Sequence, residues 1–234
     1  MNRKSLKKCA KMKNIRIVIF DIDGVLLDGK AKEKYFAEKT HKLLSKNGFN
    51  IKKSEFDSAW KSLCTVAVRK GLSITEMRRM LFKKFKIPQS LLAEYEEIDK
   101  RSLKFVRPTE NYVGRQLKKL KKDGYIVAAL SNTLYGSDEK GKILKLAGLG
   151  DTIDKIFVAT EIRHRKPERK AYYAVLDYFG VMPPEAIFVG HNEYEIKGAK
   201  AVGLHTISYK GYKKADFYAS KFSQILEYIA LAKQ

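Results

Sequence analysis

Four short, almost continuously apolar segments recur along the chain, at residues 15–20, 125–130, 155–159 and 186–190. They are rich in Val, Ile, Phe and Ala and do not alternate between apolar and polar positions, as a strand with one solvated face would. Such runs are typical of strands buried on both faces of a parallel sheet. Two later segments, 205–209 and 214–219, predict further strands at the edge of the same sheet.

Helical patterns lie between these apolar segments. Residues 109–124 carry apolar side chains on one side and stop at Gly124, and residues 167–180 begin with proline and end with glycine, the usual asymmetry of a helix. Residues 220–233 predict a closing helix. Strands that alternate with helices indicate right-handed crossover connections. We therefore expect an α/β fold, a Rossmann-like parallel sheet flanked by helices.

Residues 31–106 lie between the first and second predicted strands and show no strand pattern. They predict helices at 31–48, 54–71, 73–86 and 90–105, the third of which opens with a Ser-x-x-Glu capping box at residues 73–76. We expect these residues to form a small all-α helical-bundle cap domain. The core domain then comprises residues 14–30 and 107–234, and residues 1–13 form a basic N-terminal tail.

The composition places the chain among globular proteins of the cytoplasm. Of its 234 residues, 44% are hydrophobic and 32% are charged. No apolar run approaches the ~20 residues that a membrane-spanning helix needs, so we expect no membrane association. The two cysteines, Cys9 and Cys64, have no metal-binding or disulfide spacing, which favours a reducing, cytoplasmic compartment.

The charge balance is strongly basic, with 48 Lys and Arg against 26 Asp and Glu and a net charge of +22. Such a field attracts anionic partners, but it does not by itself distinguish nucleic acid from a phosphorylated metabolite. The basic residues fall in segments far apart along the chain. This distribution favours a dispersed solvated coat over a nucleic-acid-binding stripe.

Polar residues that follow the predicted strands are candidates for one site, because ligands of open parallel sheets bind beyond the carboxyl ends of the strands. The candidates are Asp21, Asp23 and Gly24 after the first strand, Ser131 and Asn132 after the second, Lys166 before a helix, and His191 and Glu195 after the fourth strand. Each alone has a plainer explanation, as a turn, a helix cap or a solvated charge. Together they predict a phosphate site that contains a nucleophile.

Four segments carry a resemblance to a known family: VIFDIDGVLLD (18–28), ALSNT (129–133), RKP (165–167) and, in part, FVGHNEYEIKGAKAVGL (188–204). Over about residues 14–230 the chain resembles the haloacid dehalogenase-like (HAD) hydrolase superfamily, with a helical cap of the C1 type inserted directly after the first motif. The resemblance implies a HAD-like α/β core and a hydrolytic activity.

The resemblance also implies a mechanism. Asp21 would attack phosphorus and form an aspartyl-phosphate, while Asp23 would protonate the departing alcohol and then accept a proton from the hydrolytic water. The charge on the phosphoryl oxygens would be balanced by the phosphate-binding residues, which are Asp21, Asp23, Gly24, Ser131, Asn132 and Lys166.

In this family Mg²⁺ is implied, held by Asp21, the backbone carbonyl of Asp23 and an acid of the fourth motif. This chain has His191 and Glu195 where the family usually has two aspartates, and magnesium prefers oxygen ligands. Three outcomes are open. Glu195 reaches the ion, or His191 coordinates it and shifts the preference toward Mn²⁺ or another divalent transition metal, or the site binds metal poorly.

The function expected from these observations is that of a divalent-cation-dependent phosphatase acting on a small phosphate ester, as a monomer or homodimer. The alternative is a weakly active or inactive HAD-fold protein that binds a phosphate-rich partner such as RNA. Haloacid dehalogenation is less favoured, because the proton-transferring role of Asp23 has no evident use in the displacement of halide.

Overall fold

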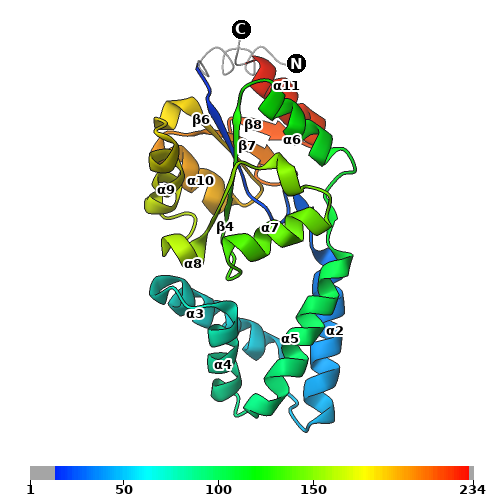
Figure 1. Ribbon diagram of the computed structural model, residues 1–234. Helices are drawn as coiled ribbons and strands as arrows, with labels where there is room; N and C mark the ends of the chain where they lie inside the picture. The colour runs from blue at the N-terminus through cyan, green and yellow to red at the C-terminus, as the bar shows by residue number, and fades with distance from the viewer. Residues whose placement is uncertain (1–13, 232–234) are drawn as a thin grey trace.

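The computed structural model describes residues 14–231 (Figure 1). The predicted basic tail and Cys9 lie outside these residues. Six parallel strands form one sheet in the order β5-β4-β1-β6-β7-β8. Their bounds are β1 (Ile17–Phe20), β4 (Ile126–Ser131), β5 (Lys155–Val158), β6 (Ala186–Gly190), β7 (His205–Tyr209) and β8 (Phe217–Ala219). The predicted parallel α/β sheet is therefore confirmed.

The central strand β1 is buried along its whole length and pairs with β4 on one side and β6 on the other. Its continuous apolar run follows from this position, since both faces of the strand are covered by helices. The prediction that residues 205–209 form an edge strand is wrong, because β7 lies between β6 and β8. The side chains of Thr206 and Ser208 in β7 are fully buried.

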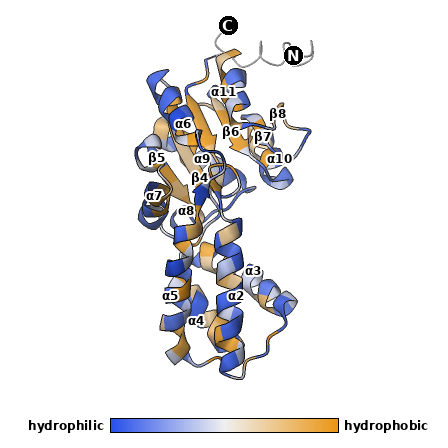
Figure 2. Ribbon diagram, turned by 90° about the vertical axis from the view of Figure 1, so that its right-hand side faces the viewer, coloured by the Kyte–Doolittle hydropathy of each residue, from blue (hydrophilic) through white to orange (hydrophobic). Residues whose placement is uncertain are grey.

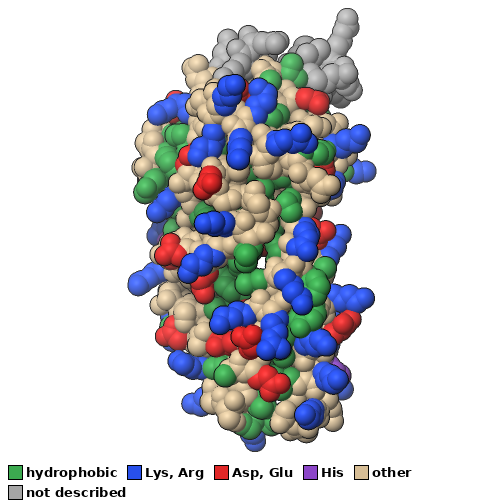
Figure 3. All heavy atoms as spheres, turned by 45° about the vertical axis from the view of Figure 1, so that its right-hand side comes forward, with side chains coloured by type: hydrophobic (Ala, Val, Ile, Leu, Met, Phe, Trp, Pro, Cys, Tyr) green, Lys and Arg blue, Asp and Glu red, His purple; other side chains and the backbone are tan. Residues whose placement is uncertain are grey.

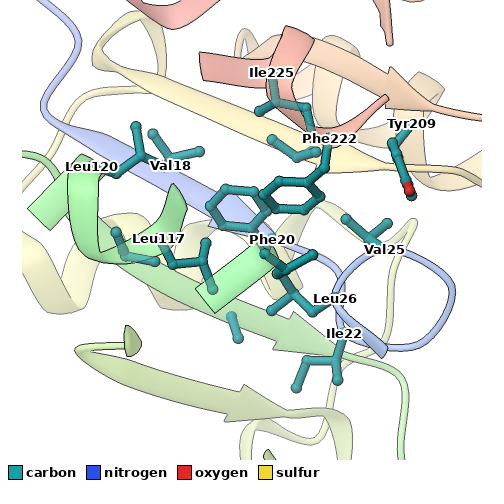
Figure 4. Close-up of a cluster of buried hydrophobic side chains, with 14 of the residues drawn as sticks. Val18, Phe20, Ile22, Val25, Leu26, Leu117, Leu120, Tyr209, Phe222 and Ile225 are labelled. Atoms are coloured by element: carbon teal, nitrogen blue, oxygen red, sulfur yellow. The ribbon is translucent and has the colours of Figure 1, made fainter. Parts of the chain in front are cut away.

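Helices cover both faces of the sheet. One face carries α6 (Val113–Lys122), α7 (Ser137–Leu146) and α11 (Phe222–Leu231), and the other carries α9 (Arg169–Phe179) and α10 (Glu193–Val202). In the first layer the rings of Phe20 and Phe222 stack with their centroids 5.9 Å apart (Figure 4). The helix α7 is absent from our sequence-based assignment, and the helix predicted at 109–124 begins only at Val113, after a turn.

Four longer helices stand apart from the sheet, below it in Figure 1: α2 (Lys30–Lys46), α3 (Lys53–Lys70), α4 (Ile74–Lys84) and α5 (Leu92–Ser102). An antiparallel pair, β2 (Leu27–Asp28) and β3 (Arg107–Pro108), joins them to the sheet. They have an apolar cluster of their own, which includes Leu44, Phe82 and Tyr95. The predicted capping box is present at the start of α4.

This helical group also contacts the sheet domain. Ala67 of α3 and Met77 of α4 pack against Leu134, which follows β4, and against Ala159 in the short helix α8 (Ala159–Ile162). In Figure 2, polar and apolar residues alternate around the group's helices, and in Figure 3 basic side chains are spread over both parts of the visible face. Between residues 14 and 231, no helix combines the length and the apolar character that crossing a bilayer requires.

Candidate active site

The polar residues predicted to converge do so at one end of the sheet. Asp21 follows β1, Ser131 is the last residue of β4, and His191 follows β6. Because these three strands are parallel neighbours, their carboxyl ends lie side by side. Asp21 is buried, and the backbone N–H of Ile22 donates to its Oδ1 atom at 2.9 Å. The carboxylate is thus held at the base of the site.

Lys166 joins two of the acids. Its Nζ atom lies 2.7 Å from Asp21 Oδ1 and 2.9 Å from Glu195 Oε2, and its side chain has no solvent exposure. Burial alone would lower the pKa of Lys166, but the two carboxylates raise it above its ordinary value. The lysine therefore stays protonated and supplies a fixed positive charge next to Asp21.

The charge state of Asp21 follows from the same contacts. Burial alone would raise the pKa of Asp21, but Lys166 and His191 outweigh burial, and the pKa lies below its ordinary value. Glu195 differs, because burial raises its pKa and the contact with Lys166 offsets this only in part. Of the two acids, Asp21 is consequently the one held firmly as an anion, which is the form that a nucleophile needs.

Asn132 holds the loop that carries Lys166. Its Oδ1 atom accepts from the backbone N–H of Lys166 at 2.8 Å, and its Nδ2 atom donates to the Lys166 carbonyl at 2.9 Å. The same Nδ2 atom donates to Glu195 Oε1 at 3.2 Å. The side chain predicted to bind phosphate is thus engaged in placing the lysine.

Asp23 has its own set of partners. Ser131 Oγ donates to Asp23 Oδ2 at 3.4 Å, and the Nζ atom of Lys140 lies 2.9 Å from Oδ1 and 2.8 Å from Oδ2. Lys140 was not among the residues selected from the sequence. The available signal was helical spacing, since Lys140, Ile143 and Leu144 share the buried face of α7. We missed it because the helix was not assigned and the lysine is one of 48 basic residues.

His191 lies over the first motif. Its ring packs on Gly24, where an added Cβ would come 2.7 Å from Cε1 of the imidazole, and Gly24 has a φ of +88°. Both features require glycine at position 24. His191 Nδ1 is 3.3 Å from Asp21 Oδ2 but lacks the alignment of a hydrogen bond. The contact with the Asp21 carboxylate raises the pKa of His191 above its ordinary value, although partial burial acts in the opposite direction.

Comparison with known proteins decides the family. The model of the haloacid dehalogenase-like hydrolase family matches residues 18–209. This chain belongs to that family. The resemblance to this family inferred from the sequence is therefore confirmed.

Named members of the family include relatives with two kinds of activity. Glyceraldehyde 3-phosphate phosphatase of Pyrococcus furiosus is 25% identical over 92% of this chain and 93% of its own length. (S)-2-haloacid dehalogenase 4A of Burkholderia cepacia is 38% identical, over 39% of this chain and 38% of its own. A solved HAD phosphatase from Thermococcus onnurineus superposes with a TM-score of 0.67 at 24% identity, covering 92% of this chain and 98% of that one. These similarities establish a hydrolase of the family, with phosphatases among its relatives.

The fit of a metal ion depends on the donors around Asp21. Over the stretch 14–231, no three side chains of His, Cys, Asp or Glu are grouped as a ready metal site. His191 Nδ1 and Asp21 Oδ2 are nevertheless 3.3 Å apart, and the Nδ1 atom is buried with no hydrogen-bond partner. Two donors at ~2.1 Å from one octahedral ion are ~3.0 Å apart, so this pair fits a divalent ion whose other ligands are oxygen atoms.

A cavity of about 1200 Å³ opens between α2 and the first half of α3. Aromatic side chains line it, including Phe36, Phe56 and Trp60. Tyr135, from the loop after β4, contributes to its wall and donates its hydroxyl to Asp99 of α5. The cavity therefore reaches the loop that connects β4 with α7, the helix that carries Lys140.

Proposed function

We propose that this protein is a phosphatase that hydrolyses a small phosphate monoester through an aspartyl-phosphate intermediate. One observation carries the proposal. Two carboxylates of a single loop are held in different ways, Asp21 between Lys166 and His191, and Asp23 beside Ser131 and Lys140. A phosphate ester needs both a nucleophile and a separate proton-transferring group, whereas the displacement of halide has no evident use for the second carboxylate.

The proposed reaction has two displacements. A carboxylate oxygen of Asp21 attacks phosphorus, the bond from phosphorus to the alcohol oxygen breaks, and Asp23, which enters the reaction in its protonated form, gives that oxygen its proton. A water molecule then gives a proton to Asp23 and attacks the phosphorus of the aspartyl-phosphate. Inorganic phosphate leaves and Asp21 is regenerated. Throughout, Lys166 balances negative charge that spreads over the phosphoryl oxygens.

We propose that a divalent cation assists this reaction and would be held by Asp21, the backbone carbonyl of Asp23 and His191. When bound, the ion neutralises phosphate charge. An imidazole ligand favours Mn²⁺ or another transition metal over Mg²⁺. We further propose that residues 31–106 act as a cap over the site, and that the substrate is a small phosphorylated molecule, in keeping with the names of the phosphatase relatives.

The test is hydrolysis of 4-nitrophenyl phosphate by purified protein with Mg²⁺, Mn²⁺, Co²⁺, Ni²⁺ and Zn²⁺ in turn. We expect turnover with at least one ion and its loss in D21N, a variant nearly identical in shape. Acid quenching during turnover should trap one phosphoryl group on wild type and none on D21N. Absence of turnover with every ion contradicts the proposal, and chloride release from 2-chloropropionate would identify a dehalogenase instead.

A further inference from the structure

Lys140 is a buried lysine whose ion-pair partner is the proposed proton-transferring acid. Its side chain is 6% exposed, while that of Asp23 is 59% exposed. The lysine is fixed by helix α7, whose neighbouring side chains Ile143 and Leu144 are buried under the sheet. The buried lysine side chain is therefore fixed by its helix, and it restrains the more exposed side chain of Asp23.

The surroundings of Lys140 connect it with Asp23 and Tyr135. Lysine is almost never fully buried unless it is paired. The described contacts of its ammonium group with charged or aromatic side chains are those with both oxygens of Asp23 and with the ring of Tyr135, whose centroid is 5.8 Å from Nζ. The hydroxyl of Tyr135 is engaged by Asp99. Asp23 is thus the side chain that this lysine contacts through both carboxyl oxygens.

We propose that Lys140 is a positioning residue that fixes the carboxylate of Asp23 for proton transfer. The proposal rests on the phosphatase function proposed above. Proton transfer requires an oxygen of Asp23 within hydrogen-bond reach of the leaving alcohol and then of water. An exposed aspartate without a partner would rotate among several rotamers. A contact from Lys140 to each oxygen, together with that from Ser131, restricts the carboxylate to one orientation.

The test compares two leaving groups. 4-Nitrophenolate departs as a stable anion and needs little help from an acid, whereas the alcohol of glycerol phosphate needs a proton. In K140M we expect kcat for glycerol phosphate to fall by about 10- to 100-fold, in line with the contribution of a correctly placed acid. We expect a much smaller fall for 4-nitrophenyl phosphate and an unchanged KM. K142M, on the exposed face of the same helix, is the matched control and should behave as wild type.

A double-mutant cycle separates positioning from general damage to the fold. If Lys140 acts through Asp23, K140M should cause no further loss in the D23N background. If K140M does not fold, K140Q takes its place, because it keeps a hydrogen-bond donor without the charge. The fall in kcat is then again compared between the two substrates. An equal fall for both substrates, or an additive loss in D23N, overturns the proposal.

The outcomes also distinguish this proposal from the proposed function. If wild type hydrolyses neither ester with any cation, the phosphatase function fails, and the role of Lys140 fails with it. If wild type is active and K140M and K140Q match it on both esters, the function stands and the role of Lys140 is refuted.

Discussion

Replacement of His191 by aspartate tests whether the imidazole accounts for the metal preference of the site. His191 Nδ1 faces Asp21 Oδ2 at 3.3 Å, the separation that suits two ligands of one ion. The variant H191D places a carboxylate at this position. We expect it to be less stable than wild type without metal and to respond more strongly to Mg²⁺, which prefers oxygen donors.

The magnitude follows from the distance between the two groups. Two unit charges 3.3 Å apart interact by roughly 5 kcal/mol at an effective dielectric constant of ~20 and by roughly 1 kcal/mol at ~80. The side chain of His191 is 41% exposed, so the lower value applies. In H191D the attraction between a protonated His191 and Asp21 becomes a repulsion between two carboxylates. This change lowers the free energy of unfolding by about 2 kcal/mol and Tm by about 4–8 °C in a chain of this size.

The assay is thermal unfolding of both proteins in EDTA and then with each divalent ion. Mg²⁺ at a hundred times its Kd stabilises a protein by about 2.7 kcal/mol, so it should more than recover the loss in H191D. Wild type should gain more from Mn²⁺ or Zn²⁺ than from Mg²⁺. Y194D, which adds a charge at a residue that is mostly exposed, is the control. Equal responses of wild type and H191D to Mg²⁺ would refute the reasoning.

Two further substitutions test the buried charges. K166M leaves the carboxylates of Asp21 and Glu195 without their shared cation and should cost about 3–5 kcal/mol of unfolding free energy in urea. The double variant K166M/D21N should recover part of this free energy. If K166M alone is as stable as wild type, the ion-pair description is contradicted. Asp99 provides the pH test. Burial alone would raise its pKa, but Lys32 and Arg78 hold the pKa below its ordinary value. Its contribution is therefore complete above the unfolded pKa of ~3.9 and is lost as the pH falls through the folded value. D99N should be about 3–5 kcal/mol less stable at neutral pH, and the difference should narrow below pH ~4. A difference that is constant with pH would contradict this assignment.

Much of the fold could be predicted because its determinants are local. The segment at residues 15–20 is apolar at every position, and only a strand covered on both faces accommodates such a run. The order of strands and helices then fixes which loops share the carboxyl edge of the sheet. For this reason Asp21, Ser131 and Lys166 could be assigned to one site although they are far apart in the chain.

The sequence pattern does not specify the setting of residues whose partners lie on other segments. The expected edge position of residues 205–209 is wrong because β8 covers β7, and there Thr206 exchanges hydrogen bonds with Asp216. The phosphate-binding role of Asn132 stays a prediction, and the structure adds that its side chain binds the loop of Lys166. The hydrogen-bond partners of Thr206 and Asn132 lie on other segments of the chain. The sequence pattern around each residue therefore does not specify its partner.

The sequence by itself determined the parallel α/β sheet and the family, and it indicated that Asp21 and His191 follow strands of that sheet. Only the tertiary structure decided that the imidazole lies on Gly24 beside Asp21, and that Lys140 holds Asp23. The physical reason is one of range. Hydrophobic periodicity acts between neighbours in the chain, whereas the pairing of charges depends on distances of about 3 Å between side chains that only the folded chain brings together.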